Sequence, residues 1–218
     1  MNYIKKLTDN IIDKIAAGEV VERPASVVKE LVENSIDAGA RSIAVRIMAG
    51  GKQAISVSDD GRGMTREDVK LCYLRHATSK LSSPSDLFNI GTLGFRGEAL
   101  ASIGAVSYMT IETRAKTDSD GTRLAIEGGV EREFQPIGRA VGTTITVRQL
   151  FFNTPARRKF LRHTDTEARH VNGVLIGLAA AYPEVEFSLD HHERSVLRFT
   201  GSTRMERAVD LLGIVHSD

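Results

Sequence analysis

The chain has little of what proteins of oxidising compartments and membranes require. Its 218 residues include one cysteine, Cys72, so no disulfide can form within the chain. No stretch approaches the roughly 18 consecutive apolar residues of a membrane span, and the segment Met1 to Lys6 lacks the apolar core of a signal peptide. We therefore expect a cytoplasmic protein with no membrane partner.

The chain also lacks an excess of charge of either sign. Lys and Arg number 29 and Asp and Glu 28, which gives a net charge of +1. This balance argues against a surface that binds nucleic acid over its whole extent, but it leaves room for a local basic patch. Arg157, Arg158, Lys159 and Arg162 form such a cluster, for which a solvated face is favoured somewhat over a DNA contact.

Several common catalytic signatures are absent from the sequence. There is no G-x-x-x-x-G-K-[ST] motif, which excludes a P-loop protein, and neither glycine-rich segment completes a dinucleotide fingerprint. No Cys and His cluster has the spacing of a zinc site. His191-His192 has no partner cysteine and is expected to be a solvated pair in a loop.

Helical and strand patterns alternate irregularly along the chain. A helix is expected from Pro24 to a stop at Gly39, and alternating residues predict strands over 42–48 and 53–59. Further strands are expected over 106–114, 122–127, 130–136 and 143–150 (an antiparallel meander), and over 185–189 and 195–199. Without regular βαβ units, the pattern favours an α+β fold, a two-layer sandwich with helices on one face of a mostly antiparallel mixed sheet.

The first expected helix carries a polar pair beside its apolar half. Glu30 and Asn34 are four residues apart, so their side chains lie one above the other. Glu can take a proton from water, and the Asn oxygen suits Mg²⁺, which keeps several waters and prefers substrate phosphates as its other ligands. Taken alone, an ordinary solvated helix face is the favoured alternative.

Asp59 ends an alternating strand on its inward face, where a carboxylate is costly unless a donor meets it. The exocyclic amino group of adenine is such a donor, whereas guanine has a carbonyl there. Gly61 and Gly63 would let the backbone approach a flat ring. Thr143 points inward on its own strand and could share a water with Asp59. The alternatives are a plain β-turn and a threonine chosen for strand propensity.

The segment from Arg75 to Gly97 is poorly periodic, which is typical of a lid over a site. Its last part, Gly94-Phe95-Arg96-Gly97, precedes a short expected helix, and backbone N–H groups at such a place suit phosphate. Arg96 and Lys80 would add positive charge. The alternative is a plain helix cap with a surface arginine.

Four motifs occur in one order along the chain: E-x-x-x-N, D-x-G-x-G, G-F-R-G-E-A-L and G-T-T. Together they resemble the Bergerat ATP-binding fold, the family of gyrase B subunits, heat-shock chaperones, sensor histidine kinases and MutL mismatch-repair proteins. Within that family, the runs KELVENSIDAG (29–39), RHATSK (75–80) and NTPARRKFL (153–161) resemble the MutL branch. The last run argues against a chaperone or a topoisomerase.

The resemblance implies ATP and Mg²⁺ as ligands and assigns a role to each candidate. Glu30 would activate water, Asn34 would hold Mg²⁺, and Asp59 would bind adenine. The remaining implied nucleotide-binding residues are Gly61, Gly63, Thr78, Lys80, Gly94, Phe95, Arg96, Gly97 and Thr143.

The resemblance also implies a domain organisation and partners. Residues 1–200 would form the ATP-binding domain, and residues 201–218 would begin a linker or a second domain. The whole protein would hydrolyse ATP slowly, pair its N-terminal domains when ATP binds, and engage a mismatch-recognition protein and downstream repair enzymes. It would bind DNA weakly and mainly as a dimer, at the nucleoid. A nucleotide-binding switch that barely hydrolyses ATP is the alternative.

Overall fold

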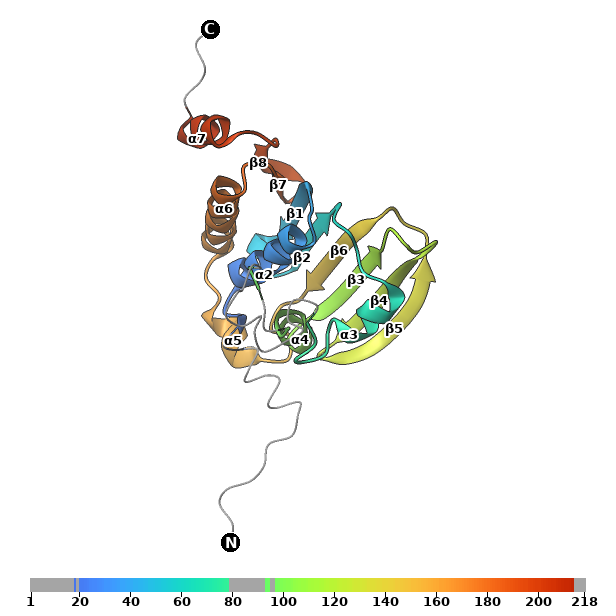
Figure 1. Cartoon of the computed structure of the whole chain (residues 1–218). Helices are drawn as coiled ribbons and strands as arrows, with labels where there is room; N and C mark the ends of the chain where they lie inside the picture. Colours follow the sequence, from blue (N-terminus) through green and yellow to red (C-terminus); the bar gives the residue numbers. More distant parts are fainter. Residues whose placement is uncertain (1–17, 19, 79–92, 95–96, 214–218) are drawn as a thin grey trace.

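The structure, a computed structural model, describes residues 18, 20–78, 93–94 and 97–213 (Figure 1). The strands are β1 (Ser42–Met48), β2 (Ala54–Asp59), β3 (Tyr108–Arg114), β4 (Gly121–Glu127), β5 (Val130–Ile137), β6 (Gly142–Arg148), β7 (Glu186–His191) and β8 (Arg194–Phe199). The helices are α2 (Pro24–Asp37), the 3₁₀ turn η1 (Ala49–Gly51), α3 (Arg66–Leu71), α4 (Ala99–Ala105), α5 (Pro155–Phe160), α6 (Thr164–Ala181) and α7 (Arg204–Leu212).

The strands form one eight-stranded sheet in the order β5-β4-β3-β6-β2-β1-β7-β8. Within the described residues, β1 and β7 run parallel and the other neighbours run antiparallel. The predicted meander is correct for β3, β4 and β5 but wrong for β6, which pairs with β3 and β2. The reason is burial: β6 buries Ile145 and Val147 in the centre of the sheet, whereas β5 is mostly exposed and suits an edge.

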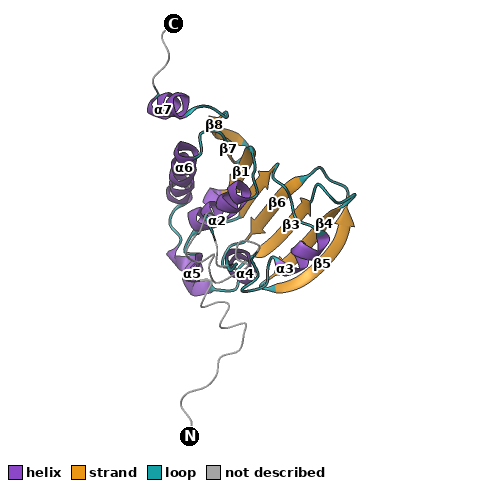
Figure 2. Ribbon diagram, viewed as in Figure 1, coloured by secondary structure: helices purple, strands orange, loops and turns teal. Residues whose placement is uncertain are grey.

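Alternate residues of the central strands point to one face, and the helices cover that face. Helix α2 packs on β1 and β2 through an apolar side that includes Val28, Leu31 and Val32, all at most 1% exposed. Helix α6 lies against α2 and β7 (Figure 2). The predicted two-layer α+β architecture, with a mostly antiparallel mixed sheet, is therefore confirmed.

The ends of α2 follow from its sequence. Pro24 occupies the first turn, where its missing N–H is not needed. The helix ends at Asp37, and Gly39 follows in the left-handed region with φ 74°. This boundary matters because the residues of interest lie in the last two turns before it.

Helix α7 docks on the end of the β7–β8 hairpin. Thr203 and Glu206 form a capping box at its start. Arg207 is 1% exposed, and its guanidinium donates to the carbonyls of Pro183, Val185 and Thr200. The proposed domain limit at residue 200 remains a prediction. In the part of the chain that the structure describes, no helix has the length and apolar character needed to cross a membrane.

Candidate functional site

Helix α2 carries a line of polar side chains along the border of its buried face. This line, the α2 polar stripe, consists of Glu30, Asn34 and Asp37, which fall within about 60° of one another on the helix. All three side chains are partly buried. Glu33 is different, because it is 8% exposed and forms an ion pair with Lys29 at 3.0 Å. The predicted position of Glu30 and Asn34 beside the apolar half is therefore present in the fold.

The stripe touches the loop that precedes α4. Asp37 accepts hydrogen bonds from the backbone N–H groups of Leu93, at 3.1 Å, and Gly94, at 3.4 Å. No role was predicted for Asp37. Its spacing of three from Asn34 and seven from Glu30 was the signal that could have placed it on the same stripe.

The two ends of the predicted lid lie side by side. Gly97 has φ 62°, and a Cβ at this position would collide with the carbonyl of Ala77, which directly precedes Thr78. Thr78, Gly94 and Gly97 therefore come together near the end of α2. The other predicted members of this loop, Lys80, Phe95 and Arg96, and most of the lid lie outside the described residues.

Asp59 is fixed at the end of β2 by donors from two elements. Its Oδ2 accepts from the Ser35 hydroxyl at 2.8 Å, and its Oδ1 accepts from the Gly61 N–H at 2.9 Å. The backbone of Thr143 lies opposite Asp59 in the sheet and favours the ionised form of the carboxylate. Burial raises the pKa of Asp59 above its usual value, although these hydrogen bonds act in the opposite direction.

Ser35 is a residue of the site that was not predicted from the sequence. It is 4% exposed and lies in the middle of the buried side of α2, where a hydroxyl needs a partner. A polar residue in an apolar helix face was the available signal. The sequence could not reveal that its partner is Asp59, which lies 24 positions away.

The glycine loop after Asp59 is packed tightly on its neighbours. A Cβ at Gly61 would lie 3.0 Å from the Asp59 Oδ1. Gly63 has φ 68°, and a Cβ there would collide with the carbonyl of Arg114 at the end of β3. Gly61 thus keeps the surroundings of the carboxylate open, whereas Gly63 is required by the protein's own backbone.

Thr143 lies beside Asp59 in the register of the sheet and points inward, as predicted. It is 8% exposed, and its hydroxyl contacts the hydroxyl of Thr113 at 2.9 Å. The register of the sheet therefore aligns three polar residues in a row across β2, β6 and β3, on the face that the helices cover. This polar row consists of Asp59, Thr143 and Thr113.

The expectation for His191-His192 is correct for His192, which is exposed and lies in the turn after β7, but wrong for His191. His191 ends β7, and its Nε2 accepts from the N–H of Gly50, at 3.3 Å. The Nε2 of His192 accepts from the N–H of Ala49, at 3.2 Å. The two rings therefore hold η1 rather than facing only water. Burial and the neighbouring His192 lower the pKa of His191.

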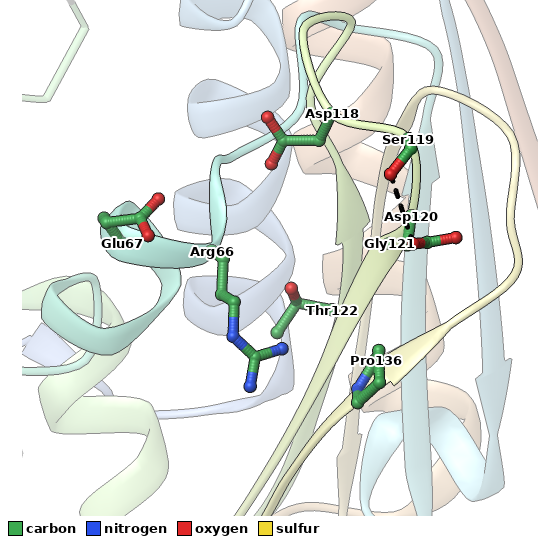
Figure 3. Close-up of a pocket in the computed structure, with 8 residues that line it drawn as sticks. All are labelled: Arg66, Glu67, Asp118, Ser119, Asp120, Gly121, Thr122 and Pro136. Carbon is green, nitrogen blue, oxygen red and sulfur yellow. Dashed lines mark hydrogen bonds between the residues drawn. The ribbon is translucent and has the colours of Figure 1, made fainter.

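A pocket of about 380 Å³ lies elsewhere, between α3 and the β3–β4 turn (Figure 3). Its lining consists of Arg66, Glu67, Asp118, Ser119, Asp120, Gly121, Thr122 and Pro136. None of the predicted site residues lines it, and Figure 3 shows Ser119 hydrogen-bonded to the adjacent Asp120. The pocket is therefore distinct from the α2 polar stripe and Asp59.

Comparison with known proteins gives the class first. The model of the family described as "Histidine kinase-, DNA gyrase B-, and HSP90-like ATPase" matches residues 22–139, which include α2, Asp59 and the described parts of the lid. The two-layer fold and this match place the chain in that class of ATPases.

The particular family follows from individual relatives. The chain is 54% identical over 210 residues to a DNA mismatch repair protein MutL of Geotalea uraniireducens and 49% identical over 210 residues to that of Geobacter sulfurreducens. Each alignment covers 96% of this chain and 35% of the relative, so the chain spans about a third of the length of these curated proteins.

Solved structures agree. The Aquifex aeolicus MutL ATPase domain complexed with ADP matches with a TM-score of 0.74 and 36% identity, over 89% of this chain and 70% of that one. The N-terminal domain of a DNA repair protein matches with a TM-score of 0.77 and 28% identity, over 96% of this chain and 63% of that one. The chain belongs to the MutL family of DNA mismatch repair proteins and corresponds to its ATPase domain.

Proposed function

We propose that this chain binds ATP with Mg²⁺ between α2 and the adjoining end of the sheet, and hydrolyses it slowly. The observation that carries the proposal is the Asp59 carboxylate, which Ser35 of α2 fixes while the polar stripe of the same helix meets the Leu93–Gly94 loop. One helix thus borders both an acceptor for a base and a loop whose backbone N–H groups already donate to a carboxylate. The ADP complex of the Aquifex aeolicus relative supports the same choice of ligand.

Asp59 recognises adenine in this proposal. An ionised carboxylate only accepts hydrogen bonds, so it suits the 6-amino group of adenine and repels the 6-carbonyl of guanine. Gly61 has no side chain between the carboxylate and the ring. Gly63 and Thr143 complete the wall of the base site.

The residues fit Mg²⁺ with few protein ligands. In the described part of the chain, no group of three or more His, Cys, Asp or Glu side chains could hold a metal. Mg²⁺ bound to a nucleotide usually takes one or two protein oxygens and keeps waters and phosphate oxygens as its other ligands. Asn34 supplies such an oxygen in this proposal. When bound, the ion would neutralise charge on the phosphates.

Glu30 acts as the general base. It lies one helical turn from Asn34 on the same side of α2, so it would be placed to take a proton from a water beside phosphates held near Asn34. Thr78, Gly94 and Gly97 are described and lie near the end of α2, and their backbone would contact the phosphates. Lys80, Phe95 and Arg96 are proposed to complete this phosphate loop.

Several functions of the whole protein are also proposed, and membership of the MutL family supports them. ATP binding would gate pairing of two N-terminal domains and couple mismatch recognition to downstream repair enzymes at the nucleoid. DNA would be bound weakly and mainly by the dimer. The α5 cluster is a candidate contact: Arg158, Lys159 and Arg162 are exposed, whereas Arg157 is partly buried against Gly18.

A titration tests the core of the proposal. The chain would be titrated with non-hydrolysable analogues of ATP and GTP, each with and without Mg²⁺. We expect the ATP analogue to bind more tightly than the GTP analogue, and Mg²⁺ to strengthen its binding. Failure to bind either analogue, or equal affinity for the two, would contradict the assignment. Binding without any hydrolysis in the full-length protein would favour a switch.

A further inference from the structure

Thr113 on β3 is a buried polar residue that the proposed chemistry does not use. It is 0% exposed, and its hydroxyl oxygen has three polar neighbours. These are the backbone N–H of Met64 at 2.9 Å, the carbonyl of Gly142 at 3.1 Å and the hydroxyl of Thr143 at 2.9 Å. Thr113 therefore joins the glycine loop to the start of β6.

The directions of these hydrogen bonds follow from counting protons. A hydroxyl has one proton to donate and two lone pairs that accept. The Met64 N–H can only donate and the Gly142 carbonyl can only accept, so Thr113 accepts from the first and donates to the second. Its remaining lone pair faces Thr143. Only one arrangement satisfies all three contacts, and in it Thr143 donates its proton to Thr113.

This arrangement fixes the chemical character of Thr143. Its only hydroxyl proton points toward Thr113, so the lone pairs of its oxygen are what it offers on the other side. The same residue lies directly opposite Asp59 in the pairing of β6 with β2. Thr143 and Asp59 thus present two acceptors at neighbouring positions of the polar row.

We propose that Thr113 is a positioning residue that makes Thr143 an obligate acceptor, and that this sharpens the preference for a 6-aminopurine over a 6-oxopurine. The inference rests on the proposed adenine site. Without the Thr113 oxygen, the Thr143 hydroxyl is free to rotate and donate. A freely rotating hydroxyl serves a carbonyl as well as an amine, directly or through a water.

The test replaces Thr113 by Val, which keeps the shape and removes the hydroxyl, and by Ser, which keeps the hydroxyl. Thr110→Val is the matched control, because Thr110 lies on the same strand and points to the opposite, open face. Affinities for non-hydrolysable ATP and GTP analogues are measured for each variant. We expect Thr113→Val to reduce the ATP-to-GTP affinity ratio about three- to tenfold, the scale of one hydrogen bond, and Thr113→Ser and Thr110→Val to retain it.

The outcomes separate this inference from the proposed function. If the parent chain does not prefer the ATP analogue, the proposed adenine site itself is refuted. A parent that prefers it, with a Thr113→Val variant that weakens both analogues equally, overturns the inference and leaves Thr113 a structural residue. If Thr113→Val does not fold, the Thr143 hydroxyl proton of the parent is observed by NMR. Slow exchange with a contact to Thr113 supports the inference, and fast exchange overturns it.

Discussion

Replacing Asp59 by Asn should separate stability from nucleotide binding. In the parent, Oδ1 accepts from Gly61 and Oδ2 accepts from Ser35. The amide oxygen of Asn can take the place of Oδ1, which puts its NH₂ group toward Ser35. The Ser35 hydroxyl also lies 3.1 Å from the carbonyl of Leu31, so it can donate there and accept from the new amide. Each of these two hydrogen bonds is therefore either kept or replaced in the variant.

The charge on Asp59 adds a pH dependence with a definite sign. Burial raises the folded-state pKa of Asp59 above the ordinary value of 3.8 that applies to the unfolded state. Between the unfolded-state pKa and the folded-state pKa, the folded state therefore binds more protons than the unfolded state. The parent therefore loses stability as pH rises through that window, and the cost is fully present at neutral pH. Asn does not titrate. We expect the Asp59→Asn variant to equal or exceed the parent in free energy of unfolding at pH 7, with the difference shrinking in acid.

Nucleotide binding should change in the opposite direction. The amide would present N–H donors to the donor group of adenine, and losing a hydrogen bond to a charged group costs about 1.5–3 kcal/mol. That range corresponds to roughly 10- to 150-fold weaker binding. Titration calorimetry with a non-hydrolysable ATP analogue measures this loss, and urea denaturation measures stability.

The matched control is Asp60→Asn, which makes the same charge change one residue away. Asp60 is exposed, and its Oδ1 accepts from the N–H groups of Arg41 and Ser42, at 2.8 and 2.9 Å. An Asn at that position can keep both bonds, so nucleotide affinity should stay at the parent value. If Asp59→Asn binds the analogue as tightly as the parent does, Asp59 is not the adenine acceptor and the reasoning is refuted.

Three further predictions concern other residues. Glu30→Ala should retain ATP binding but reduce hydrolysis roughly 10²–10⁴-fold, and a full-length variant with the parent rate would contradict the base assignment. Asn34→Ala should weaken Mg²⁺-ATP far more than metal-free nucleotide, and equal losses in calorimetric titrations would indicate a structural role. The pKa of His191 is lowered from 6.5, so the unfolded state binds more protons just below that pH. Unfolding free energy should therefore fall as pH drops through 6.5, and less so in His191→Gln.

The face that each helix or strand buries was predictable because apolar residues recur along it with the period of that element. Alternation along β2 placed Asp59 inward, and the helical period placed Glu30 and Asn34 beside the buried half of α2. Pro24 and Gly39 fixed where that helix begins and ends. These features depend on neighbours close in sequence.

The partners of these elements were not predictable in the same way. A period of two tells which face a strand buries but does not tell which strand lies beside it, so β6 was expected beside β5 and lies beside β3. The bonds from Ser35 to Asp59 and from Asp37 to Leu93 join elements far apart in sequence. The His191 contact with Gly50 spans 141 positions.

Helix α2 relates the two halves of the proposed site to each other. On its buried side, Ser35 donates a hydrogen bond to Asp59. On its polar stripe, Asp37 accepts hydrogen bonds from the Leu93–Gly94 loop. The helix between them is held by apolar side chains at most 1% exposed, which leaves it little freedom to tilt. The distance from the proposed adenine acceptor to the proposed phosphate-binding loop is therefore set by one rigid element. Glu30 and Asn34 lie on that same element, so the proposed base and metal ligand have fixed positions relative to both.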